Sequence, residues 1–266
     1  MINSLNSSLD SANAAIGTAL ARLSSGFRIN STKDDPAGMQ IASQMGVQIS
    51  SAAVAMNNIA DGLSSAETAG GGLGQASETL QRMRELAVQS GNGTYSASDR
   101  QAIQAEFSQL SSSLDTVSRQ TQFNGQNLLD GTFSTSIQTG PNSGDKTSIS
   151  YGNVSASALG IANADISTAA GSQAALAAID QAMVTVDKAQ ANVGATQAAL
   201  DSSSANLGVS NLNLSASHSA IADANYAQAS SDQVLAGIRQ QSALKTFALY
   251  NANQANILSL LPGQTK

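Results

Sequence analysis

Apolar residues recur at every seventh position over two long stretches of this chain. The repeat runs from residue 52 to 87 in the first half, with a second stripe three or four positions away, and from residue 179 to 221 in the second half. A spacing of seven with a 3–4 split places both stripes on one face of an α-helix, and its length predicts coiled-coil packing. The repeated positions are Ala52, Ile59, Ala66, Leu73, Leu80 and Ala87, then Ile179, Val186, Val193, Leu200, Leu207, Leu214 and Ile221.

The composition favours slender helices over a thick core. Aromatic residues make up 3% of the 266 residues and charged residues 11%, and there is no Trp or Cys. Small side chains let helix backbones approach closely, whereas the absence of Cys excludes disulfides and thiolate sites. A formal net charge of −6 argues against binding to nucleic-acid phosphates, and no apolar run reaches the ~20 residues that span a bilayer. We therefore predict a mainly α fold.

The middle of the chain combines one further helix with a hairpin. Residues 95–119 carry apolar residues at helical spacing, and Ser98 is a candidate N-cap. Glycines then punctuate residues 124–153, where two short segments alternate apolar and polar residues. We predict a small β-hairpin at about 133–152 that turns through residues 140–144, and this is the one region with a good strand signal.

Both ends carry apolar stripes with little charge around them. A short helix of this kind is marginal alone and needs a partner that covers its apolar face. We expect both ends to be poorly ordered in the monomer and to fold against each other and against neighbouring copies on assembly. The predicted self-assembly stripes are Leu5, Leu9, Ile16 and Leu23 at the N-terminal end, and Val234, Ile238, Phe247, Ile257, Leu260 and Leu261 at the C-terminal end.

No catalytic constellation is found in the sequence. His218 is the single histidine, and we interpret it as a solvated or packing residue. The glycines at 70–72 lack the GK[ST] string and the strand that a phosphate-binding loop requires, so they are read as small residues of a helix. We expect no enzyme activity and predict no catalytic, metal or cofactor-binding residue. The first residues have no basic region or continuous apolar core, so no cleavable signal peptide is expected, and any export would use a route that needs none.

Five strings then resemble one family in order along the chain. ARLSSGFRINSTKDDPAGMQIA (21–42), LQRMRELAVQSGNGT (80–94) and QTQFNGQNLLDG (120–131) resemble the N-terminal half of bacterial flagellins. IADANYAQASS (221–231) and NANQANILSLL (251–261) resemble the C-terminal part. Each string alone is moderately specific, and the ordered set of five is very specific.

The resemblance implies a domain plan and a function. Residues 1–35 plus 223–266 would form an inner coiled-coil domain, and residues 36–222 would form a long-helix domain with the hairpin, as in a minimal flagellin without large variable outer domains. The implied function is a structural subunit that polymerises into the extracellular filament of the bacterial flagellum for motility. The implied partners are other copies of the chain, the flagellar export apparatus, an export chaperone, the filament cap and hook-junction proteins. No nucleic acid and no membrane insertion are expected.

Two alternatives and one secondary site remain open. The chain could be a hook–filament junction protein of the same axial family, or a flagellin-like surface adhesin. Resemblance also maps a contact patch for a Toll-like innate receptor onto Arg82, Leu86 and Glu106. The competing interpretation is that these residues stabilise the helical domain, with Arg82 paired to Glu78 or Glu85. The sequence also departs from the family near His218, where arginines and acids are usual, and in the PGQTK tail (262–266).

Overall fold

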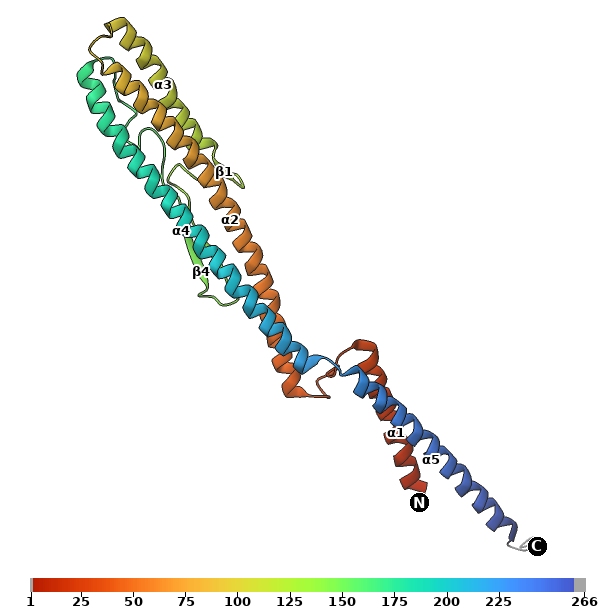
Figure 1. Ribbon diagram of the computed structural model, residues 1–266. Coiled ribbons are helices and arrows are strands. Elements are labelled where there is room, and N and C mark those ends of the chain that lie inside the picture. The colour runs from red at the N-terminus through yellow and green to blue at the C-terminus, as the bar shows by residue number, and fades with distance from the viewer. Residues whose placement is uncertain (1, 261–266) are drawn as a thin grey trace. The chain divides into compact units, whose positions relative to one another are not determined.

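The computed structural model describes residues 2–260 and consists mainly of helices. In chain order these are α1 (Ile2–Ser25), α2 (Pro36–Ser90), α3 (Ala97–Gln120), α4 (Ala169–Ala222) and α5 (Tyr226–Leu260), shown in Figure 1. Four short strands lie between α3 and α4: β1 (Gln122–Phe123), β2 (Gln126–Asn127), β3 (Ser134–Gln138) and β4 (Lys146–Ser150). The predicted fold class, long helices from both halves of the chain with a small β-hairpin, is confirmed.

The chain divides into two compact units. Unit 1 contains the residues up to 49 and from 212 onward, and unit 2 contains residues 50–211. The boundaries of these units fall inside α2 and α4, and the domain boundaries at 35/36 and 222/223 stay a prediction. In unit 1 the loop before α2 and the end of α4 are joined by hydrogen bonds, for example from Arg28 N to Ala222 O at 2.7 Å. These contacts tie the adjoining ends of α2 and α4 to the chain termini.

Unit 2 has its own hydrophobic core, which the heptad stripes supply. Every predicted stripe residue from 52 to 87 and from 179 to 207 is buried. The helix α3 adds the side chains of Phe107 and Leu114, and the segment after the hairpin adds Ile161 and Ile166. An ion pair between Arg84 Nε and Asp180 Oδ1, at 2.8 Å, also joins α2 to α4. Leu214 and Ile221, the last two stripe positions, are half-buried in unit 1.

The start of α3 is fixed by a capping box. The hydroxyl of Ser96 accepts a hydrogen bond from Asp99 N, and the carboxylate of Asp99 accepts one from Ser96 N. The N-cap is therefore Ser96, and the prediction of Ser98 is wrong. The residue three positions after Ser96 is the acidic Asp99, which can return the hydrogen bond, so the box closes there.

The predicted hairpin is present, and a second one accompanies it. β3 pairs antiparallel with β4, from Ser134 opposite Ser150 to Gln138 opposite Lys146. β1 and β2 form a smaller antiparallel pair around Asn124 and Gly125, whose φ angles are 49° and 75°. Two successive positive φ angles are typical of a type I′ turn, which favours the Asn-Gly dipeptide.

Candidate functional site

The two ends of the chain pair with each other in unit 1. α1 and α5 run antiparallel, side by side, and their Cα atoms come within 8 Å of each other. Ala12 and Ala19 of α1 are buried in this contact, as are Ala229 and Ala236 of α5. Small side chains permit this close approach, because the distance between two helix axes depends on the side chains at the contact. We call α1 and α5 together the terminal pair.

The predicted N-terminal stripe faces the inside of the terminal pair. Its four larger members, Leu5, Leu9, Ile16 and Leu23, are half-buried and alternate along α1 with the two buried alanines. The spacing is again three and four residues, as expected for two packed helices. A hydrogen bond from Gln240 Nε2 to Asn13 Oδ1, at 2.8 Å, runs across the pair.

The C-terminal stripe is divided between two faces of α5. The face toward α1 consists mainly of small and polar residues, with two aromatic residues near its end. Phe247, a member of the predicted stripe, is half-buried on this face. The residues of this face, spaced three and four apart, are Ala229, Gln233, Ala236, Gln240, Ala243, Phe247 and Tyr250.

Two other predicted members, Val234 and Ile238, lie off the face toward α1. Val234 is 59% exposed and Ile238 is 56% exposed, whereas Ala236 between them is 3% exposed. Residues two apart lie on roughly opposite sides of an α-helix, because each residue turns the helix by about 100°. Leu235 and Leu249 are also at least half exposed, whereas Ile257, which is 55% exposed, lies seven residues after Tyr250 and continues the heptad of the inner face. The side chain of Leu260, the residue Leu261 and the PGQTK tail lie outside the described residues.

A compact turn, the junction (residues 26–35 with 221–225), connects the terminal pair to the adjoining helix ends of unit 1. Gly26 ends α1 with φ of +76°, and its N–H donates to Arg22 O at 2.9 Å, an arrangement typical of a helix C-terminus. Ala224 N then donates to Gly26 O at 2.8 Å, which joins the two chain segments.

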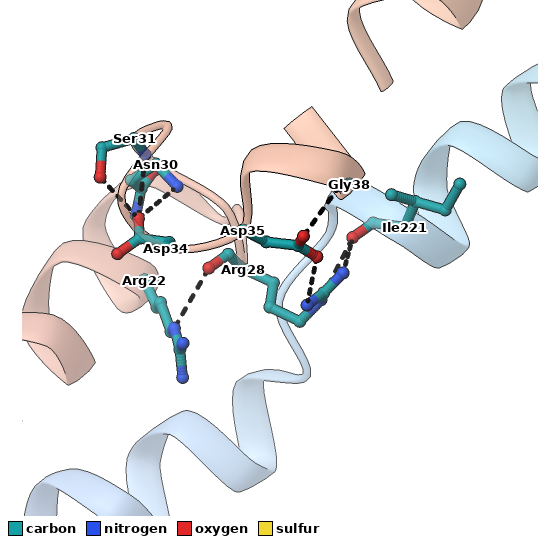
Figure 2. Close-up of polar contacts among 8 residues, drawn as sticks. All are labelled: Arg22, Arg28, Asn30, Ser31, Asp34, Asp35, Gly38 and Ile221. Atoms are coloured by element: carbon teal, nitrogen blue, oxygen red, sulfur yellow. Dashed lines mark hydrogen bonds and ion pairs between the residues drawn. The ribbon is translucent and has the colours of Figure 1, made fainter. Parts of the chain in front are cut away.

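Arg28 is the central side chain of the junction. Its Nε and Nη2 both donate to Ile221 O, at 3.1 and 2.5 Å, and its Nη1 lies 3.7 Å from Asp35 Oδ2 (Figure 2). Ile221 is in the last turn of α4, where carbonyl groups lack partners within the helix. A cation at this end also interacts favourably with the helix dipole. Arg28 thus holds the end of α4 against the start of α2.

The neighbouring carboxylate, Asp34, shapes the loop itself. Its Oδ2 accepts hydrogen bonds from Asn30 N at 3.0 Å and from Ser31 N at 2.9 Å (Figure 2). These bonds, the Asn30 one first, lower the pKa of Asp34 below its ordinary value, since they favour the charged form. Asp35 Oδ1 accepts from Gly38 N at 2.8 Å and so caps the first turn of α2. The string SSGFRINSTKDDPAG therefore encodes a closed, hydrogen-bonded turn.

A second polar cluster lies on unit 2. Arg82 Nη2 lies 2.7 Å from Glu106 Oε1, and Arg82 Nη1 lies 3.0 Å from Glu85 Oε2. Arg82 and Glu106 are about half exposed and Glu85 is more exposed. The hydrogen bonds to Glu106 and then Glu85 raise the pKa of Arg82. Leu86 is 1% exposed and belongs to the core. Of the predicted receptor patch, the structure thus places Arg82 and Glu106 together at the surface and Leu86 beneath it.

Several observations concern other classes of site. His218 is half-buried on α4, and among residues 2–260 no group of three or more potential metal ligands is found. Within the same residues, no helix is long and apolar enough to cross a membrane.

The sequence contained signals for two features that pattern reading missed. Asn-Gly is the dipeptide that a type I′ turn favours, so Asn124-Gly125 indicates the turn between β1 and β2. The Ala/Gln positions of α5 follow a heptad from residue 229 to 250, which the larger apolar residues nearby obscured. Arg28 lies within the flagellin-like string at 21–42, and its contact with α4 links residues 193 positions apart, which no local pattern encodes.

The fold is that of a protein of long helices, in which the helices at the two chain ends pack against each other in one unit. The model of the bacterial flagellin N-terminal helical region matches residues 1–134, and that of the C-terminal helical region matches residues 176–261. The chain therefore belongs to the bacterial flagellin family.

Individual relatives agree with this assignment. The chain is 46% identical over 162 residues to the B-type flagellin of Pseudomonas aeruginosa, which covers 60% of this chain and 33% of the relative. It is 46% identical over 153 residues to a flagellin of Salmonella muenchen, covering 58% and 30%. The matches thus span about a third of the length of these curated relatives.

Solved structures show the same fold. The crystal structure of Bacillus cereus flagellin matches with a TM-score of 0.52 and 28% identity, covering 57% of this chain and 88% of that one. A putative flagellar hook-associated protein from Vibrio parahaemolyticus matches with a TM-score of 0.59 at 18% identity, covering 71% and 99%. At that identity, the second likeness supports the fold alone.

Proposed function

We propose that this chain is a structural subunit that polymerises into the flagellar filament, and that the terminal pair is its main assembly element. The observation that carries the proposal is the outer face of α5, where Val234, Leu235, Ile238 and Leu249 are each at least half exposed. Family membership supplies the filament as the product of assembly.

The two faces of α5 support this role. α1 covers the inner face of α5, so the outer face of α5 is not needed to form the terminal pair. An exposed row of large aliphatic side chains typically marks a surface that another protein covers. A helix with one face in its own subunit and the other against a neighbour links folding of the ends to assembly. Contacts that continue head to tail without closing give a helical polymer instead of a ring.

The supporting experiment removes most of α5. Deletion of residues 234–261 should leave unit 2 folded, because its core is built from residues 50–211. Circular dichroism should therefore report a helical protein, while electron microscopy of seeded solutions should show no filaments. Full-length protein, seeded in parallel, serves as the control. Normal filaments from the truncated chain would refute the assembly role of the terminal pair.

The finer assignments follow from the same proposal. The filament would lie outside the cell, and the partners would be the export apparatus, an export chaperone, the filament cap and hook-junction proteins. No enzyme activity forms part of the proposal. Receptor recognition is a weaker extension, since it depends on Arg82 and Glu106 without a surface contribution from Leu86. A cell reporter assay with Arg82→Ala tests it, and an unchanged response would rule out this patch.

A further inference from the structure

A groove runs along one side of the terminal pair. One cavity of about 300 Å³ lies between Arg22 and Asp232, and a second of about 550 Å³ continues toward Leu5. Both are lined by Ala15 and Arg239, so they form one continuous groove. Its lining from α1 and α5 consists largely of Ala, Ser and Thr, and its larger apolar members are Leu5, Leu235 and Ile238.

The groove carries a cation without a partner. Arg239 lines both cavities, and within residues 2–260 no carboxylate pairs with its guanidinium. Arg22, at one end of the groove, is already engaged, because its Nε donates to Arg28 O at 3.2 Å. Arg239 is therefore the one groove arginine whose side chain is free to meet an incoming group.

The matching anion lies elsewhere on the same pair. Asp10 is the single charged residue between positions 1 and 21, is exposed, and makes no ion pair within the described part of the chain. It lies five residues before Ala15, which places it about 140° around α1 from the groove at about 100° per residue. Asp10 is also not among the residues that face α5. One face of the terminal pair thus presents the acid, and a different face presents the base.

We propose that α1 of a second copy lies in this groove, with its Asp10 against Arg239. The inference rests on the proposed filament function and deepens it, since it names the segment and the charged pair that join two copies. Because donor and acceptor lie on different faces, each copy offers one groove and one α1. The contact is therefore head to tail and can repeat from copy to copy, and it gives an open filament where the rotation between copies does not close a ring. Charge complementarity of this kind fixes register more than it adds affinity.

Charge reversal tests the pair. Asp10→Arg alone and Arg239→Glu alone should each raise the critical concentration for seeded polymerisation by about tenfold, because each places like charges together. Lys245→Glu is the matched control, since it reverses a charge on the same helix outside the groove lining and should leave the critical concentration within about twofold. Circular dichroism of each monomer checks that its helix content is unchanged.

Mixing the two variants makes the test specific for contacts between copies. Where the Asp10→Arg variant inserts its α1 into the groove of the Arg239→Glu variant, the two substituted side chains meet with opposite charges. In the reverse arrangement, the unsubstituted Asp10 and Arg239 meet as in wild type. An equimolar mixture should therefore polymerise at close to the wild-type critical concentration, although neither variant does so alone. The double variant should recover in the same way.

The outcomes separate this inference from the proposed function. If wild-type chain fails to elongate its own seeds, the filament proposal falls and the inference falls with it. If wild-type chain polymerises and both single variants do so equally well, the groove contact is wrong. If the singles are impaired and the mixture stays impaired, Asp10 and Arg239 do not face each other between copies.

Discussion

Replacing one exposed side chain on α5 should weaken assembly without weakening the fold. Ile238 is 56% exposed in the single chain, so Ile238→Ala removes little that the monomer buries. Full burial of such a side chain contributes about 1.5–3 kcal/mol. The exposed fraction that a neighbour would cover is then worth about 0.8–1.7 kcal/mol, and at about 1.4 kcal/mol per factor of ten this raises the critical concentration about four- to sixteenfold.

The assay is seeded elongation followed by sedimentation, with the thermal melt of the monomer measured beside it. Val184→Ala is the matched control, because Val184 is an aliphatic residue of unit 2 that is 44% exposed. It should leave the thermal melt and the critical concentration close to wild type. An Ile238→Ala chain that polymerises like wild type would show that the outer face of α5 is not covered in the filament. A melt that drops by several degrees would show that Ile238 supports the monomer instead.

Three further predictions concern the fold. Leu200→Asp should unfold unit 2, because Leu200 is fully buried and the carboxylate would have no partner there; an unchanged thermal melt would refute the core assignment. Gly71→Ala should stabilise unit 2 by about 1 kcal/mol in denaturant titrations, since a Cβ there meets nothing within 4 Å, whereas Gly62→Ala should gain less or destabilise, because its Cβ would lie 2.4 Å from Ile137 Cδ1. On acidification, the contribution of Asp34 should be lost as the pH falls through its lowered pKa, below the ordinary value near 4, and an NMR titration midpoint at or above 4 would contradict this.

The long helices could be predicted because their cores repeat one simple pattern. Leu73 and Leu80 of α2 are seven residues apart, Val186 and Leu200 of α4 are fourteen apart, and all four are large, apolar and fully buried. Burial of large side chains is the dominant favourable term in folding, so the pattern that supplies it specifies the element. The hairpin at β3–β4 was predictable for a similar reason, since alternation and a glycine-rich turn coincide.

The position of the unit boundary was not predictable in this way. The helical pattern of α2 and α4 continues through residues 49 and 212 without a break, so nothing local marks where one unit ends. The adjoining ends of α2 and α4 belong to unit 1, and the junction holds them there, because the Arg28 guanidinium donates to the carbonyl of Ile221. A contact between residues so far apart in sequence depends on the chain already having returned to its start.

The C-terminal helix shows most clearly why a hydrophobic pattern is insufficient for the assembly surface. Pattern reading selects the largest apolar residues and assigns them to the inner face. In α5 the inner face needs close approach to α1, so Ala229 and Ala236 occupy it and the large residues Val234 and Ile238 are displaced to the outside. In an isolated globular domain, that exchange would expose apolar surface without compensation. In a chain that buries its outer face against copies of itself, as we propose for this one, the two faces of α5 serve two contacts, and the apolar face exposed in the monomer is the one that a neighbouring copy would cover.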